Sequence, residues 1–156
     1  LGAMGFGLGA AVGGCIASGR RRTVLFTGDG SFGMSMGDLE TARRLSLPIL
    51  FVNLQNDCYG WIKTIQRLYY KSNYYGVDFS GIDAVKIAEG FYLPARGIVN
   101  NAQVKDTLSW ALAETKKGSP VFLNVKIQSI EEYVPPVCQW EKDSRLPEDQ
   151  RKKLVY

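Results

Sequence analysis

Short segments that are apolar at nearly every position recur along the chain, and longer segments with a helical pattern separate them. The clearest are PILFVNL at residues 48–54 and PVFLNVKI at residues 120–127. The other predicted strands are residues 24–27 and 95–99, and the predicted helices are residues 4–18, 35–45, 61–69, 83–90 and 101–117. Strands that are apolar on both faces and alternate with helices are typical of a parallel sheet covered by helices on either side. The sequence therefore predicts an α/β fold with a parallel sheet and helices on both faces.

The residue types exclude several classes of protein. The chain has 156 residues, 46% of them hydrophobic, which is enough for the core of one domain. Its apolar stretches are too short to cross a bilayer, and a net charge of +4 with mixed signs outside residues 20–22 predicts no nucleic-acid partner. Because histidine is absent, Ser-His-Asp catalysis and His-ligated zinc are excluded. Cys15, Cys58 and Cys138 are odd in number and far apart, which favours a cytoplasmic protein over a secreted disulfide framework.

The two ends of the chain predict its organisation. Residue 1 is Leu, and the sequence opens inside a patterned glycine-rich segment, so we expect a fragment that begins within a domain. We assign residues 1–130 to that domain, without its N-terminal part, and residues 131–156, with their prolines and mixed charges, to an extended tail. One face of the predicted helix 101–117 is apolar, as in an amphipathic helix; it carries Val104, Leu108, Ala111 and Leu112.

Polar residues follow two of the predicted strands at their carboxyl ends. Gly28-Asp29-Gly30 ends the first strand, and Asn56 follows the next one. Taken alone, Asp-Gly is a common turn pair, but a right-handed crossover returns the second strand end beside the first. Oxygen ligands such as a carboxylate and an amide suit Mg²⁺, which takes its other ligands from phosphate and water. Gly30 and the Ser31 amide, near a helix N-terminus, would then meet phosphate oxygens.

Gly-Asp-Gly followed, after one helix and one strand, by an Asn-containing turn resembles the motif of thiamine-diphosphate-dependent enzymes. The surrounding GDGSFGMSMGDLETARRLSLPILFVNLQND is similar to the acetolactate synthase and 2-oxoacid decarboxylase group, and the leading LGAMGFGLGAAVG to the segment just upstream in that family. The resemblance covers residue 1 to about Ile127 and implies the thiamine-diphosphate-binding fold. The run GFGLGAAVG also invites a dinucleotide-binding interpretation, but no strand precedes it.

The resemblance implies a role for individual residues. Asp29 and Asn56 would bind Mg²⁺ through side-chain oxygens, and Cys58 through its backbone carbonyl. Residues of the cofactor site would be Gly2, Met4, Gly28, Gly30, Ser31, Asn56, Tyr59 and Gly60, with the Gly2 carbonyl accepting a hydrogen bond from the aminopyrimidine and Met4 holding the cofactor bent. The substrate pocket would contain Trp61, Ile62 and Ile65. No catalytic residue is expected in this chain, because the activating glutamate belongs to a pyrimidine-binding domain of the same or another subunit.

The resemblance also implies an activity. We expect a domain of an acetolactate synthase-like enzyme, in a homo-oligomer, that joins 2-oxo acids after decarboxylation. Ile62 stands where pyruvate decarboxylase-like enzymes have a glutamate, and Ile65 where acetolactate synthases often have tryptophan. A subunit of a pyruvate or sulfopyruvate decarboxylase-like enzyme, and a non-catalytic binding module, stay open as alternatives. A flavin (FAD) belongs, if anywhere, elsewhere in the full enzyme, since no residue of this chain indicates one.

Overall fold

The structure is a computed structural model of the chain, and it describes residues 2–129, 134 and 136–151. The chain forms two compact units. The first consists of Leu1–Gln55 and Ile82–Ile127, and the second of Asn56–Gly81 and Gln128–Tyr156. The chain therefore leaves the first unit after Gln55, returns at Ile82 and leaves it again after Ile127. Each unit is described by itself below.

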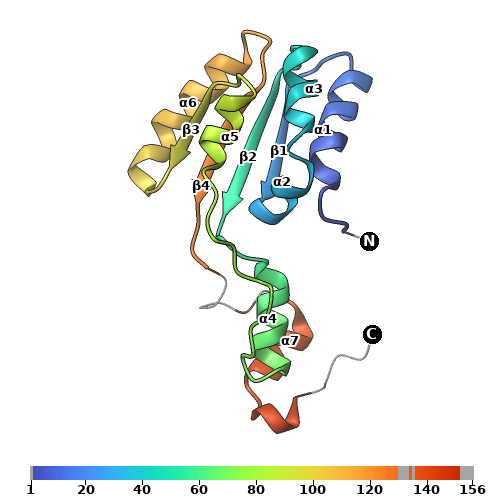
Figure 1. Cartoon of the computed structure of the whole chain (residues 1–156), viewed down its shortest axis with the longest axis vertical. Helices are drawn as coiled ribbons and strands as arrows, with labels where there is room; N and C mark the ends of the chain where they lie inside the picture. The colour runs from blue at the N-terminus through green and yellow to red at the C-terminus, as the bar shows by residue number, and fades with distance from the viewer. Residues whose placement is uncertain (1, 130–133, 135, 152–156) are drawn as a thin grey trace. The chain divides into compact units, whose positions relative to one another are not determined.

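The first unit is built on a parallel sheet, as the sequence predicted (Figure 1). Its strands are β1 (Thr23–Gly28), β2 (Ile49–Gln55), β3 (Ala95–Ile98) and β4 (Val121–Lys126). They lie in the order β1-β2-β4-β3, and every neighbouring pair is parallel. In this register Gly28 pairs with Leu54, so the carboxyl ends of β1 and β2 lie side by side at the same end of the sheet.

The helices of the first unit are α1 (Phe6–Ala17), α2 (Asp29–Ser35), α3 (Asp38–Arg44), α5 (Ala84–Gly90), the 3₁₀ helix η1 (Asn101–Gln103) and α6 (Val104–Thr115). One prediction needs correction here. The sequence predicted a loop after Asp29 and one helix over residues 35–45, whereas the chain enters α2 at Asp29 itself and divides into α2 and α3. Gly28 is extended, and a carboxylate in the first turn of a helix is stabilised by the positive end of the helix dipole.

The two faces of the sheet carry separate apolar layers. Helices α1, α2, α3 and α5 cover one face, and their buried side chains, which include Leu8, Phe32 and Leu39, pack against Phe51 and Phe122. The Phe32 and Phe122 rings lie 5.1 Å apart. Helix α6 packs on the opposite face, where its Ala111 joins a core of Leu50, Val52, Ile98, Val121 and Leu123. The predicted covering of both faces is therefore confirmed.

Helix α6 does not use the face that its apolar pattern predicted. Its buried residues are Thr107, Ala111 and Thr115, one row at four-residue spacing. Val104, Leu108 and Leu112 are 40%, 39% and 41% exposed, so of the predicted apolar face only Ala111 is buried. The small Thr and Ala side chains let the helix backbone lie close to the sheet, which leaves the longer residues at the margin of the contact.

Glycines allow α1 to approach its neighbours closely. A Cβ atom on Gly7 would lie 3.2 Å from Leu25 Cδ1, and one on Gly9 would lie 3.4 Å from Asp38 Oδ2. Gly5 caps the helix at φ 82°, a left-handed conformation that glycine adopts without strain. The glycine-rich start of the chain therefore serves the packing of α1 against β1 and α3.

The second unit contains α4 (Gly60–Tyr69), α7 (Cys138–Ser144) and the 3₁₀ helix η3 (Glu148–Gln150). Leu68, Tyr69 and Trp140 form its buried apolar cluster, and Ile65 packs against them. The prediction of an extended tail is thus wrong for residues 138–144 and 148–150, which are helical. In α7, Trp140 provides an apolar anchor onto α4. Residues 130–133, 135 and 152–156 of the predicted tail lie outside the described residues, and the predicted domain boundary at residue 130 stays a prediction.

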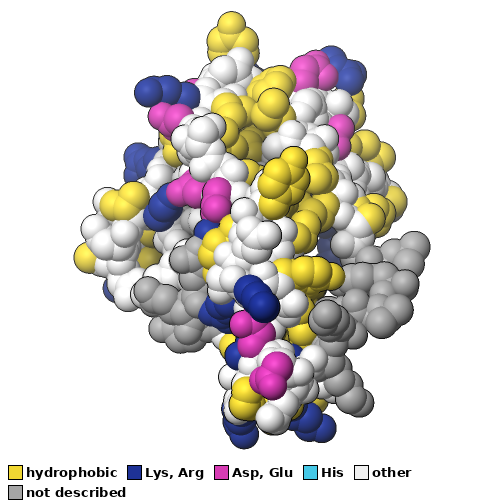
Figure 2. Space-filling model, turned by 60° about the horizontal axis from the view of Figure 1, so that its bottom comes forward, with side chains coloured by type: hydrophobic (Ala, Val, Ile, Leu, Met, Phe, Trp, Pro, Cys, Tyr) yellow, Lys and Arg dark blue, Asp and Glu magenta, His cyan; other side chains and the backbone are white. Residues whose placement is uncertain are grey.

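Two surface properties bear on the sequence-based expectations. On the face drawn in Figure 2, Lys and Arg side chains are interspersed with Asp and Glu, and hydrophobic side chains reach the surface among them. Within the described part of the chain, no helix is long and apolar enough to cross a membrane.

Candidate cofactor and metal site

Asp29 directly follows β1 and is the first residue of α2, at the carboxyl ends of the strands. The residue is only 4% exposed, and its Oδ1 atom accepts a hydrogen bond from the Gly30 backbone N–H at 2.9 Å. The Gly30 amide, which the sequence assigned to a phosphate, thus donates to the Asp29 carboxylate in this structure. A buried carboxylate at a strand end is more than a solvated turn, which was the simpler explanation of this Asp-Gly pair.

The glycine-rich segment before α1 meets the segment after β1. The backbone N–H of Gly5 donates to Ser31 Oγ at 3.1 Å, across 26 positions of sequence. Gly2, at φ 62°, and Met4 lie just before Gly5 and are exposed. The structure therefore joins the two segments that the resemblance assigned to the aminopyrimidine and to the diphosphate of one cofactor.

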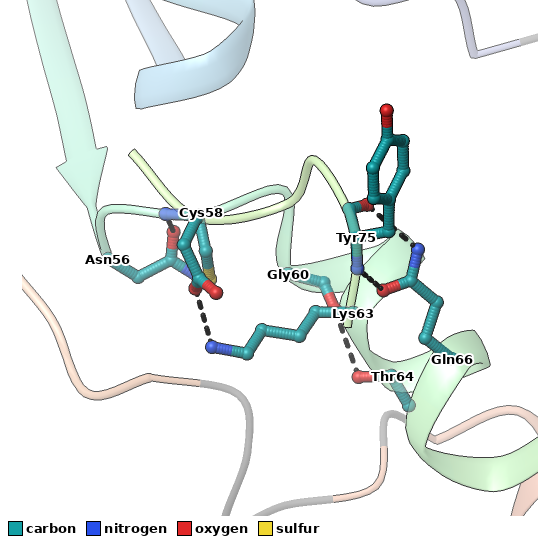
Figure 3. Close-up of polar contacts among 8 residues, drawn as sticks. Asn56, Cys58, Gly60, Lys63, Thr64, Gln66 and Tyr75 are labelled. Carbon is teal, nitrogen blue, oxygen red and sulfur yellow. Dashed lines mark hydrogen bonds and ion pairs between the residues drawn. The ribbon is translucent and has the colours of Figure 1, made fainter. Parts of the chain in front are cut away.

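Asn56 opens a tight turn at the start of the second unit (Figure 3). The Cys58 backbone N–H donates to Asn56 Oδ1 at 3.4 Å, and Asp57 between them is left-handed at φ 59°. A later segment of the second unit also stabilises the turn, because the Phe79 N–H donates to the Asp57 carbonyl at 2.9 Å. Asx-type turns of this kind fix an Asn side chain close to its own backbone.

Helix α4 follows the turn and begins at the predicted cofactor residue Gly60. The Thr64 hydroxyl donates to the Gly60 carbonyl at 3.0 Å, as Figure 3 shows. Lys63 Nζ lies 2.5 Å from Asp78 Oδ1. Of the three residues assigned to a substrate pocket, Trp61 and Ile62 are exposed, whereas Ile65 packs on the apolar cluster of the second unit.

The predicted ligands are divided between the two units. Asp29 belongs to the first, and Asn56 and Cys58 to the second, so their joint binding of one Mg²⁺ stays a prediction. The described residues contain no group of three or more His, Cys, Asp or Glu side chains suited to a metal ion. The predicted ligands include only one side chain of these four types that would bind the metal, the Asp29 carboxylate, beside the Asn56 amide oxygen and the Cys58 backbone carbonyl. This set of three oxygen ligands fits the chemistry of Mg²⁺.

Sequence reasoning missed a chain of hydrogen-bonded amides, two of them buried, that ends next to the predicted ligand Asn56. Asn53 Nδ2 donates to Asn124 Oδ1 at 2.8 Å, and Asn124 Nδ2 donates to Gln55 Oε1 at 2.6 Å. The signal was available, because Asn53 and Asn124 are polar residues within strands that are otherwise apolar. Their pairing across β2 and β4 depends on a register that the sequence does not reveal.

The family model of the "Thiamine pyrophosphate enzyme, C-terminal TPP binding domain" matches residues 1–125 of the chain. The chain belongs to this family. Thiamine pyrophosphate is another name for thiamine diphosphate, so the match confirms the predicted resemblance and the predicted class of cofactor. It takes in α1, the Asp29 strand end and the Asn56 turn.

Curated relatives and a solved structure agree with this family. The acetolactate synthase large subunit of Buchnera aphidicola subsp. Schizaphis graminum is 33% identical over 140 residues, which are 89% of this chain and 24% of the relative. The benzoylformate decarboxylase of Pseudomonas aeruginosa is 32% identical over 130 residues, which are 83% of this chain and 24% of the relative. The crystal structure of benzoylformate decarboxylase from Polynucleobacter necessarius matches with a TM-score of 0.75 and 28% identity, over 87% of this chain and 25% of that one.

These lengths limit what the comparisons say about a whole enzyme. The chain spans about a quarter of the length of the curated relatives it matches. The relatives named here are a synthase subunit and a decarboxylase, both within the predicted group of enzymes. The family and the fold are therefore those of a thiamine-diphosphate-binding domain.

Proposed function

We propose that this domain binds Mg²⁺ and the diphosphate of thiamine diphosphate in an acetolactate synthase-like enzyme that joins 2-oxo acids after decarboxylation. The observation that carries the proposal is Asp29, a buried carboxylate at the paired ends of β1 and β2 in a member of this family. The strand next to it leads directly into Asn56.

In this proposal each segment has its own task. Asp29, Asn56 and the Cys58 carbonyl hold the Mg²⁺, and Gly28, Gly30, Ser31, Tyr59 and Gly60 surround the diphosphate. Gly2 and Met4 receive the aminopyrimidine end, and the Gly5–Ser31 hydrogen bond supports their placement beside the diphosphate segment. Two side-chain oxygens and one carbonyl leave coordination positions for phosphate and water, as Mg²⁺ requires.

The bound cofactor would supply a nucleophilic thiazolium carbon, and the protein would supply position and surroundings. Trp61, Ile62 and Ile65, in the first half of α4 and at its middle, are the residues we assign to the substrate. An isoleucine at position 62 cannot donate a proton, so release of an aldehyde would lack a ready general acid there. We therefore favour carbon–carbon bond formation over simple decarboxylation.

A decarboxylase is the second candidate. It is supported by the benzoylformate decarboxylases among both the relatives and the solved structures. Product analysis with pyruvate separates the two, since the main product would be a carboligation product in the first case and acetaldehyde in the second.

The proposed enzyme needs a partner. The activating glutamate would come from a pyrimidine-binding domain of the same or another subunit, and we expect a homo-oligomer in the cytoplasm. Val24 and Phe26 on strand β1, which lies at an edge of the described sheet, are 51% and 68% exposed. Apolar side chains on an edge strand are suited to contact with another chain or domain.

Calorimetry with thiamine diphosphate and Mg²⁺ tests the binding function. The chain should bind the cofactor only when Mg²⁺ is present. Asp29→Asn should weaken this binding by at least about 10- to 100-fold, the loss seen when only a support of a metal ligand is removed, because it removes the charge of a ligand itself. Asp38→Asn is the matched control, because Asp38 also lies in the first turn of a helix but outside the proposed site. Equal binding by Asp29→Asn and the unaltered chain would overturn the assignment of Asp29.

A further inference from the structure

We propose that the hydrogen-bonded amides of Asn53, Asn124 and Gln55 form a positioning relay that orders the end of β2 and thereby sets the affinity of the adjoining turn for Mg²⁺. The inference rests on the proposed function, because Asn56 in that turn is the proposed ligand. None of the three relay residues would touch the metal ion.

Each side-chain amide of the relay donates a hydrogen bond to the next group. Asn53 donates to Asn124 at 2.8 Å, Asn124 donates to Gln55 at 2.6 Å, and Gln55 Nε2 donates to the Ile82 carbonyl at 3.2 Å. Asn53 is 0% exposed and Gln55 is 6% exposed. Asn124 between them is half-buried. The two buried amides hold one orientation, because a rotation would break a hydrogen bond in a place that water does not reach.

Gln55 contacts all three points at which the chain passes between the two units. It is itself the last residue of the first unit before the chain leaves it. Its side chain binds Ile82, where the chain returns, and its carbonyl accepts from the N–H of Ile127 at 2.9 Å, where the chain leaves again. One residue therefore contacts the segment that leads into the Asn56 turn, the segment that returns from residues 56–81, and the segment that leads on to residue 128.

The cost at the start of the relay argues against a role in stability alone. Asn53 Oδ1 is buried and has no hydrogen-bond partner within the described part of the chain. An unsatisfied buried acceptor offsets much of what the hydrogen bonds of such a network contribute, and an apolar pair of similar shape would serve the core at least as well. A relay that gains little stability is explained by the position it gives to Gln55.

The position of Gln55 matters because Asn56 is the next residue. A metal ligand binds well when its own supports hold it in place, and loss of such supports weakens metal affinity even though the ligand remains. The relay supports Asn56 through one peptide bond, from the carboxyl end of β2.

The double substitution Asn53→Leu with Asn124→Leu separates position from stability. It removes the orphaned acceptor and the Asn124 donor to Gln55 while it fills the same volume with apolar groups. Leu123→Ala is the control, since Leu123 precedes Asn124 in β4 but packs on the opposite face of the sheet. Three quantities are measured on the full chain: the denaturation midpoint, hydrogen exchange at the Ile127 and Phe79 amides, and the Kd for Mg²⁺ at saturating thiamine diphosphate.

The double variant should be at least as stable as the unaltered chain, yet exchange faster at both amides and bind Mg²⁺ about tenfold more weakly. The control should lose stability and keep its Mg²⁺ affinity. Gln55→Met, which removes the Gln55 side-chain bonds to Asn124 and Ile82, should reproduce the effect if the double variant fails to fold. Unchanged exchange and unchanged Mg²⁺ affinity in the variants would overturn the relay. Absence of any Mg²⁺-dependent binding by the unaltered chain would instead overturn the proposed function. In that case the exchange data alone would decide whether the relay orders the turn.

Discussion

The backbone N–H of Gly5 donates a hydrogen bond to Ser31 Oγ at 3.1 Å, and so joins the glycine-rich segment before α1 to the helix that follows β1. The two residues come from the two parts of the chain assigned to opposite ends of the same cofactor. Their contact is made in the first unit and does not depend on where the second unit lies.

Ser31→Ala should destabilise the fold by about 1 kcal/mol, because it leaves the partly buried Gly5 N–H without its acceptor. Hydrogen exchange at the Gly5 amide should accelerate more than exchange in the middle of α1. Ser35→Ala is the control, since Ser35 lies one turn later and its hydroxyl donates within its own helix, to the Ser31 carbonyl. Equal effects of the two substitutions would contradict a specific role for the Gly5–Ser31 hydrogen bond.

Two glycines, one at the N-cap of α1 and one in its interior, should respond in opposite directions to alanine. Gly13→Ala should stabilise the chain by about 0.5–1 kcal/mol, because a Cβ there meets no atom within 4 Å in the interior of α1. Gly5→Ala should destabilise it by about 1–2 kcal/mol, since φ is 82° and the new Cβ would lie 3.3 Å from Met34 Cβ. Urea denaturation midpoints measure both, and a stabilising Gly5→Ala would show that the left-handed cap is not needed.

A buried hydrogen bond ties α7 to α4 in the second unit. Tyr69 donates through its hydroxyl to Asp143 Oδ2 at 2.6 Å, and Asp143 is 1% exposed. Tyr69→Phe should cost about 1–3 kcal/mol, because the carboxylate loses a donor and cannot reach water. Hydrogen exchange in α7 should rise accordingly, while Tyr70→Phe, on the exposed neighbour, should leave it within experimental error.

The start of α5 should respond to acid. The Lys86 backbone N–H donates to Asp83 Oδ1 at 3.1 Å, and this hydrogen bond, assisted by the Lys86 side chain, lowers the pKa of Asp83 below its usual 3.8. The charged form is therefore favoured in the folded chain, so its contribution to stability is fully present above pH 3.8 and is lost as the pH falls through the lowered pKa.

Asp83→Asn should therefore be less stable than the unaltered chain at about pH 7, and the difference should vanish at about pH 2, where the aspartate is protonated. Denaturation midpoints at the two pH values measure the difference. A gap that persists undiminished in acid would mean that the charge of Asp83 contributes nothing to the cap.

Local pattern alone was enough to predict the four strands, the parallel sheet and the position of Asp29 after the first strand, but not α2, which begins at Asp29, nor α7. Apolar runs such as residues 48–54 lack the alternation of a strand with one solvent-exposed face, so they favour a sheet that is covered on both sides. The Gly-Asp-Gly strand end is likewise local, and the family match over residues 1–125 bears out the resemblance drawn from it. Such features are encoded by neighbours in sequence.

The tertiary structure decided what depends on distant residues meeting. The strand order β1-β2-β4-β3 puts Asn124 opposite Asn53, and only that register turns two isolated asparagines into a relay ending at Gln55. Packing against the sheet, rather than the apolar pattern, chose the Thr107–Ala111–Thr115 face of α6, because small side chains allow the closer approach. Residues 138–144 form a helix whose Trp140 packs on α4, more than sixty positions earlier in the chain. The local pattern around Trp140 does not indicate this distant contact.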